Sequence, residues 1–146
     1  PFLARTAAPV SAVDDRVRPL IRAMFETMYA AEGIGLAAPR VGVGKRVIVL
    51  DVSPADENVP PMAIVNPEIV ERKGSVTGEE GCLSVPGVQG EVCRAESVVV
   101  RGFDPEGRPL HVSAAGILSR ALQHEIDHLD GILFIDRISS AAAPAR

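Results

Sequence analysis

Two long stretches of the chain repeat apolar residues at the spacing of an α-helix. In the first, over residues 15–31, apolar positions recur in steps of three and one; they are Val17, Leu20, Ile21, Met24, Phe25, Met28 and Tyr29. This spacing places one apolar face along a helix. Asp14 or Asp15 is the expected N-terminal cap, and Gly33 is the expected end of the helix.

The second predicted helix covers residues 114–130, with Ser113 as its N-cap and Gly131 as its stop. Its core-facing stripe consists of Leu118, Leu122, Ile126 and Leu129. A second stripe on the same helix consists of Ile117, Ala121, His124 and His128. The helix therefore has an apolar face for the core and a neighbouring face that combines apolar residues with two imidazoles.

The chain between the two helices is rich in β-branched residues and predicts strands. We expect a strand at 47–52, an extended segment at 62–70 interrupted by Pro67, and another at 92–103. The turn residues 104–107 should join 98–103 to 109–112 as a hairpin. This order predicts an α+β fold, with the second helix packed against a mostly antiparallel sheet. One domain is expected over 1–138, followed by a flexible tail over 139–146.

Composition and charge narrow the classes of function. The chain has 146 residues and a net charge of −4, which argues weakly against a nucleic-acid partner. No apolar run approaches the roughly 20 residues that span a membrane, and no signal peptide is visible. We therefore expect a cytoplasmic protein that binds neither nucleic acid nor membrane. An organellar location stays open, because the N-terminus is incomplete.

The chain has two cysteines, too few for a disulfide framework, so both are expected to remain thiols in a reducing compartment. Cys93 is expected to be a small buried hydrophobic residue. Cys82 lies in a segment with glycines and prolines on both sides, which is typical of a loop or a strand edge.

The second helix carries the pattern His-Glu-x-x-His. His124 and His128 are four residues apart, so both imidazoles lie on one face and can bind one metal ion. Glu125 is then placed to act as general base. The alternative is an exposed helix with two solvated histidines. Ile117 and Ala121 on the same stripe favour a pocket wall instead. The third histidine, His111, is expected to be structural or exposed.

A catalytic site of this kind needs a third protein ligand. Cys82, in the segment Glu79 to Pro86, is a candidate, although that segment taken alone is weak evidence. Its two neighbouring carboxylates oppose thiolate formation, whereas a bound metal favours it.

Three segments together resemble the peptide deformylase family. They are Gly33-Ile34-Gly35-Leu36-Ala37-Ala38, Glu80-Gly81-Cys82-Leu83-Ser84 and Gln123-His124-Glu125-Ile126-Asp127-His128. Their order and spacing match the family, and the similarity runs from about residue 3 to residue 138. The resemblance implies an α+β fold and removal of the formyl group from the N-terminal formyl-methionine of new polypeptides, with release of formate.

The resemblance also implies roles for individual residues. One divalent metal ion, typically ferrous iron and replaceable by zinc, nickel or cobalt, would be held by Cys82, His124 and His128. Glu125 would move a proton from water to the leaving amine, and the N–H of Leu83 would stabilise the oxyanion. The residues expected to contact the substrate are Ile34, Gly35, Gly81, Ile117, Arg120 and Ala121. Ile34 and Gly35 would pair with the substrate as with an added strand.

Two arginines depart from the family pattern. Arg40 replaces the family Gln that donates to the reacting oxygen; it either supplies a charged donor or turns outward. A carboxylate such as Glu79 or Glu80 could screen its charge. Arg120 stands where the family usually has an apolar pocket residue, and its head is expected to reach water. If both arginines faced the site, activity would be reduced, or a negatively charged substrate would be preferred.

Four hypotheses follow. The first is an active deformylase that acts on formyl-methionyl nascent peptides, with transient proximity to the ribosome. The chain stops soon after Arg137, without the C-terminal helix of many relatives, which puts ribosome docking in doubt. The second is a paralogue altered at Arg40 and Arg120. The third, a zinc protease, leaves Cys82 and the first motif unexplained. The fourth is a non-catalytic, metal-stabilised binding domain.

Overall fold

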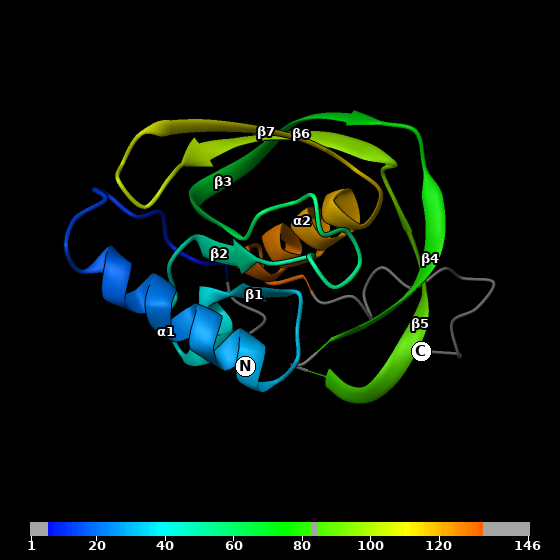
Figure 1. Cartoon of the computed structure of the whole chain (residues 1–146), viewed down its shortest axis with the longest axis horizontal. Helices are drawn as coiled ribbons and strands as arrows, with labels where there is room; N and C mark the ends of the chain where they lie inside the picture. The colour runs from blue at the N-terminus through cyan, green and yellow to red at the C-terminus, as the bar shows by residue number, and fades with distance from the viewer. Residues whose placement is uncertain (1–5, 83–84, 133–146) are drawn as a thin grey trace.

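The computed structural model describes residues 6–82 and 85–132, and for 81–82 and 85–89 it describes the backbone alone. Two helices and a five-stranded sheet form the body of the protein, and a separate hairpin stands beside them (Figure 1). The helices are α1 (Val17–Ala30) and α2 (Gly116–Leu129). The sheet strands are β1 (Gly35–Ala37), β2 (Val47–Leu50), β3 (Met62–Lys73), β6 (Ser97–Phe103) and β7 (Pro109–Ala115). The hairpin strands are β4 (Val76–Cys82) and β5 (Val85–Arg94), and a short 3₁₀ turn, η2 (Ala38–Val41), follows β1. The α+β prediction is confirmed.

The sheet has the strand order β1-β2-β3-β6-β7, and every pair in it is antiparallel. The two helices cover opposite faces of the β1–β3 region. Ile48 and Leu50 pack in the cluster that contains the core stripe of α2, while Val47 and Val49 pack in the cluster that contains α1. This explains why β2 is an unbroken apolar run rather than an alternating one, because both of its faces are covered.

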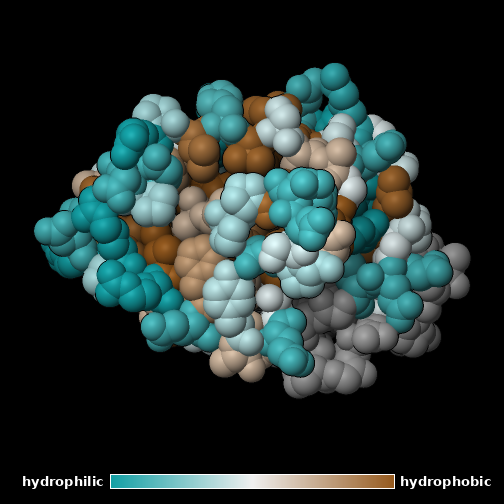
Figure 2. All heavy atoms as spheres, in the orientation of Figure 1, coloured by the Kyte–Doolittle hydropathy of each residue, from teal (hydrophilic) through white to brown (hydrophobic). Residues whose placement is uncertain are grey.

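The core-facing stripe predicted for α2 is confirmed, since all four of its leucine and isoleucine side chains are buried. The prediction for α1 is also confirmed within two residues at its start and one at its end. The apolar face of α1 turns toward the sheet, and its outer surface is largely hydrophilic (Figure 2).

The predicted helix caps were partly wrong. Arg16, not an aspartate, occupies the N-cap of α1, and Asp14 instead accepts a hydrogen bond from the Arg16 N–H at 2.9 Å. Ser113 does not cap α2, because β7 continues through it to Ala115, paired with β6. The helix starts only at Gly116, whose φ of +62° turns the chain out of the strand.

Both helices end in the same hydrogen-bonded turn, in which the first residue after the C-cap has positive φ. At the end of α2 that residue is Gly131, with φ +75°, as predicted. At the end of α1 it is Glu32, with φ +57°, rather than Gly33. The Gly33 N–H still closes the turn by donating to the carbonyl of Met28 at 2.9 Å.

The predicted extended segment 92–103 consists of two strands that belong to different sheets. The chain leaves the hairpin after Arg94 and enters the five-stranded sheet at Ser97. The predicted hairpin across residues 104–107 is confirmed as β6 and β7. Cys93 is exposed rather than buried, because it alternates along β5 with the buried Val92 and Arg94. Residues 139–146 lie outside the described part of the chain.

Candidate active site

The two histidines of α2 present their ring nitrogens to each other. The Nε2 atoms of His124 and His128 are 3.2 Å apart, and the His128 side chain is buried. Two imidazole nitrogens at about 2.0–2.1 Å from one tetrahedral zinc-like ion would be about 3.3 Å apart. The pair therefore fits a single metal ion. Among the described residues no group of three possible ligands comes together, and the side chain of Cys82 and all of Leu83 lie outside that description.

Glu80 fixes the orientation of His124. Its Oε1 lies 2.9 Å from Nδ1 of His124, and its side chain is buried. Hydrogen bonding through Nδ1 leaves Nε2 of the ring directed at His128, which is the arrangement that metal-binding histidines adopt with a carboxylate partner. Burial alone would raise the pKa of Glu80, but hydrogen bonds from His124 and Arg94 and the positive charge of Arg94 lower it to about 2. Glu80 is therefore a carboxylate at neutral pH.

A buried cluster of charges surrounds this carboxylate. Arg94 of β5 donates twice to Glu80, from Nε and from Nη2, each at 3.0 Å. Arg94 also pairs with Asp127 of α2. Burial alone would lower the pKa of Arg94, and the bonds with Glu80 and Asp127 raise it instead. Each charge has an opposite partner, as a buried ion cluster requires.

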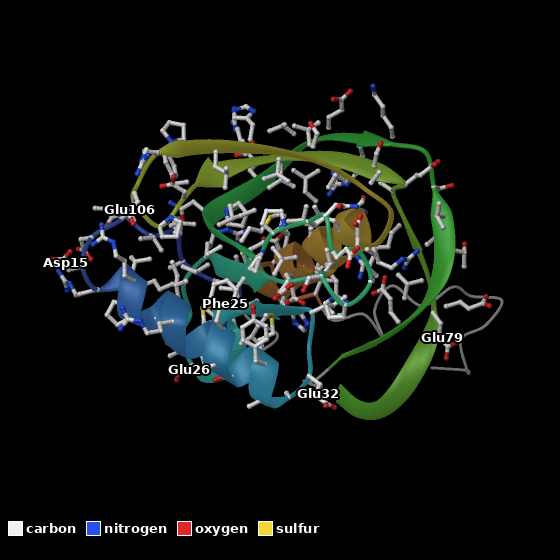
Figure 3. The ribbon with its side chains drawn as sticks, in the orientation of Figure 1. Asp15, Phe25, Glu26, Glu32, Glu79 and Glu106 are labelled. Atoms are coloured by element: carbon white, nitrogen blue, oxygen red, sulfur yellow. The ribbon has the colours of Figure 1, made fainter. Side chains whose placement is uncertain are left out.

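Arg120 joins the same cluster, and the expectation that its head reaches water was wrong. Its guanidinium pairs with Glu80 and donates to the carbonyl of Val92 at 3.1 Å and to that of Val76 at 2.7 Å. The side chain is only 16% exposed. The hairpin β4–β5 covers this face of α2, so the guanidinium binds protein groups instead of water. Glu80 thus neutralises Arg120; Glu79 is exposed on β4 (Figure 3).

Glu125 lies against the first motif. A Cβ atom built on Gly35 would come within 2.8 Å of Oε2 of Glu125 and within 3.0 Å of its Cγ. The side chain of Glu125 is buried. Only a glycine at position 35 therefore admits the carboxylate in this position, and β1 and α2 meet at this contact.

The strand β1 offers one edge for binding. Within residues 6–82 and 85–132 it pairs with β2 alone, so its other edge carries no strand. Gly35 lies in this strand, and Ile34 precedes it. The carbonyl of Ile34 accepts the N–H of Asp51 at 2.8 Å, which fixes the start of β1 against the chain after β2.

The remaining predicted residues differ in how exposed they are. Ala121 is buried in the cluster beneath α2, and Ile117 is 37% exposed, so these two do not form one closed wall. Arg40 is exposed on η2. For Gly81 the structure describes the backbone alone, as part of β4. His111 is exposed, as expected.

Several residues that serve the site were missed from the sequence. Glu80 was expected to screen Arg40 or to oppose thiolate formation at Cys82, not to contact His124, and Arg94, Asp127, Ser119 and Gln123 were given no role. The side chain of Gln123 accepts a hydrogen bond from the N–H of Ala95 and donates one to its carbonyl, each at 2.9 Å, directly after β5. The available signal was polarity on the buried side of α2, where Ser119, Gln123 and Asp127 lie among apolar residues.

Comparison with known proteins gives a consistent result. The family model described as polypeptide deformylase matches residues 1–143. A peptide deformylase of Thermodesulfovibrio yellowstonii is 51% identical over 137 residues, which cover 94% of this chain and 83% of the relative. One of Alkalilimnicola ehrlichii is 52% identical over 140 residues, covering 95% and 78%.

Solved structures agree with the sequence relatives. A peptide deformylase of Synechococcus elongatus, in complex with actinonin, superimposes with a TM-score of 0.90 at 48% identity, covering 95% of this chain and 76% of that one. A class I type b peptide deformylase of Acinetobacter baumannii superimposes with a TM-score of 0.91 at 43% identity, covering 94% and 92%.

The fold and its relatives define a metal-dependent hydrolase. The chain belongs to the polypeptide deformylase family. Its activity is removal of the N-formyl group from nascent polypeptides, and neither the altered paralogue nor the binding domain is favoured. No helix in the described part of the chain is long and apolar enough to cross a membrane.

Proposed function

We propose that Cys82, His124 and His128 hold the metal ion of this hydrolase, and that the native ion is Fe²⁺, with Zn²⁺, Ni²⁺ or Co²⁺ able to substitute. The observation that carries the proposal is the contact of Glu80 with His124. Cys82 follows Glu80 by two residues on β4, so the strand that bears the cysteine passes the histidine pair. Thiolate and imidazole together suit a borderline metal ion.

When bound, the metal ion would polarise the formyl group and lower the pKa of water at the site. Glu125 would act as the general base and then return the proton to the leaving amine. Its buried position against Gly35 supports this role, because the carboxylate is held by close packing rather than exposed to solvent. The N–H of Leu83 would donate to the developing oxyanion, an interaction typically worth roughly 2.7–4 kcal/mol in the transition state.

The substrate would be a nascent chain that begins with formyl-methionine, bound in extended form along the open edge of β1 at Ile34 and Gly35. Gly81, Ile117 and Ala121 remain proposed contacts. Arg120 is not needed as one, because Glu80 and two carbonyl groups already bind its guanidinium. Arg40 is exposed, which favours a site that lacks the family's glutamine donor over a cationic one.

We further propose that the protein works in a bacterial-type cytoplasm, takes part in protein biosynthesis and meets its substrates close to the ribosome. The bacterial origin of its relatives supports this location, and the nature of the substrate supports the proximity.

The test is formate release from a formyl-Met tripeptide, with protein loaded anaerobically with Fe²⁺ or Ni²⁺. Glu125→Gln should abolish turnover while the metal content stays at one ion per chain. Loss of bound metal in Cys82→Ala, with a folded protein, would support the third ligand; unchanged metal content would refute it. Arg40→Gln reports on the exposed arginine, and a kcat/KM unchanged by it would mean that Arg40 does not limit the reaction.

A further inference from the structure

Among residues 6–82 and 85–132, the strands of the β4–β5 hairpin form a backbone ladder only with each other. Its two strands pair with each other and form a sheet separate from the five-stranded one. In Figure 1 the hairpin stands at the right of the view, apart from the five-stranded sheet. Side-chain contacts therefore contribute to its distance from α2, and with it to the distance of Glu80 from His124.

Within the described residues, further side-chain contacts besides that of Glu80 with His124 connect the hairpin, and Ala95 directly after it, to α2. Gln123 binds Ala95, where the chain leaves β5. Arg94 reaches Asp127 from the end of β5. Arg120 is different, because it reaches from α2 to both strands at once, to the carbonyl of Val76 on β4 and to that of Val92 on β5.

The space for this arginine is formed by a glycine. A Cβ atom on Gly78 would lie 3.2 Å from Cζ and from Nη2 of Arg120, closer than most such contacts. The guanidinium therefore lies directly over the backbone of β4. Its planar shape can direct N–H groups to Glu80 and to two carbonyl oxygens together, which a lysine ammonium on a flexible stem does less well.

Arg120 and His124 lie one helical turn apart and contact the same carboxylate, through Oε2 and Oε1 of Glu80. We propose that Arg120 is a positioning residue: it holds the β4–β5 hairpin against the histidine face of α2 and so fixes Glu80 on His124. The proposal rests on the proposed metal site and adds to it the device that keeps the site assembled. It replaces the earlier expectation that Arg120 contacts the substrate.

The experiment compares Arg120→Met, Arg120→Lys and Gly78→Val with Arg101→Met. Arg101 pairs with Glu68 at 3.1 Å between two strands, but both side chains are more than half exposed, so this variant controls for loss of an arginine–glutamate pair. Three quantities are measured. They are the rate at which Co²⁺-loaded protein loses its metal to a chelator, the visible spectrum of the Co²⁺ site, and hydrogen exchange of residues 76–94.

Arg120→Met should lose Co²⁺ about ten times faster than wild type, because loss of a residue behind a metal ligand typically costs about 10–100-fold in metal affinity. Its Co²⁺ spectrum should change, exchange should quicken in the hairpin but not in β2 or β3, and KM for the tripeptide should stay constant. Arg120→Lys should give values of these quantities between those of the wild type and Arg120→Met. Gly78→Val should resemble Arg120→Met, and in a Glu80→Gln background Arg120→Met should have a smaller effect.

Two results would overturn the proposal. In the first, Arg120→Met matches Arg101→Met in its rate of metal loss, its Co²⁺ spectrum and the hydrogen exchange of its hairpin, which would make Arg120 a dispensable contact. The other is a raised KM with unchanged metal loss, which would make it a substrate contact. If the wild-type protein neither retains Co²⁺ nor releases formate, the proposed function fails instead, and hairpin exchange in metal-free protein still decides the role of Arg120.

Discussion

Replacement of Gly35 by alanine tests whether β1 positions Glu125, the proposed general base. The added Cβ would lie 2.8 Å from Oε2 and 3.2 Å from Cδ of Glu125. Atoms do not pack at the shorter distance, so either the carboxylate turns or β1 retreats from α2. The backbone of Gly35 is outside the positive-φ region, which means that alanine brings a steric change without backbone strain.

The expected loss is large because Glu125 is buried and the added Cβ would meet its Cγ at 3.0 Å as well as its carboxylate. A displacement of about 1 Å at a catalytic group can cost roughly 10²-fold in rate, which is about 2.7 kcal/mol in the activation free energy. Forcing extra volume into a packed site typically costs about 1–3 kcal/mol of stability. We therefore expect kcat to fall about 100-fold in a protein that still folds and still binds one metal ion.

The assay is a double-mutant cycle with Glu125→Ala, which removes the atoms that the new Cβ would meet. In that background Gly35→Ala should cost little further stability in urea unfolding. Gly42→Ala is the control. There the Cβ meets nothing within 4 Å but φ is +81°, so stability should fall and kcat should not. Wild-type kcat in Gly35→Ala, or equal stability costs in both backgrounds, would refute the reasoning.

Three further predictions concern stability and can be checked by urea unfolding. Glu32→Gly should stabilise the protein by about 0.5–1 kcal/mol, because Glu32 has φ +57° at the end of α1 and glycine adopts that φ without cost; a loss would contradict this. Tyr29 donates to Asp51 at 2.5 Å, and the bonds from Ser53 and then Tyr29 lower the pKa of Asp51. The stability that comes from this lowered pKa is present above about pH 4 and is lost as the pH falls through the lowered pKa. Tyr29→Phe should therefore lower the free energy of unfolding by about 1 kcal/mol at pH 7 and make it depend less steeply on pH in acid. The same pH dependence in the variant and the wild type would contradict this prediction. The side chain of Asn66 accepts a hydrogen bond from the N–H of Val10 and donates one to its carbonyl, each at 2.8 Å. Asn66→Asp keeps only the acceptor, so it should cost about 1–2 kcal/mol of stability and expose the N-terminal segment to proteases. An unchanged cleavage rate would contradict this.

The elements with long, regular patterns could be predicted from the sequence. The stripe of α2 and the turn between β6 and β7 are examples, since helical spacing and turn residues are local signals. The prediction of Ser113 as a helix cap was wrong because the preference of serine for a cap is local, whereas the pairing of β7 with β6 that keeps Ser113 in a strand depends on residues elsewhere in the chain. The residue with positive φ at the end of α1 was predicted as Gly33 rather than Glu32 for a similar reason, because glycine has the better intrinsic preference for positive φ.

The histidines and Glu125 could be predicted because one helical turn relates them. The cluster behind them could not. Glu80 and Arg94 are 14 residues apart, and only the pairing of β4 with β5 and the docking of both on α2 bring their charges together. Arg120 appeared as a surface residue because nothing in the helix pattern shows that a hairpin covers it.

The geometry of α2 explains why the site needs three separate segments. Successive residues on a helix point about 100° apart, so His124 and Glu125 cannot be supported by the same neighbour. The hairpin serves one direction, where Glu80 contacts His124, and β1 serves the other, where Gly35 contacts Glu125. The two supports differ in kind. On the β1 side the constraint is the absence of a side chain, and on the hairpin side it is a set of buried charges. Substitutions on the first side should therefore impair proton transfer while metal stays bound, and substitutions on the second should weaken metal binding first.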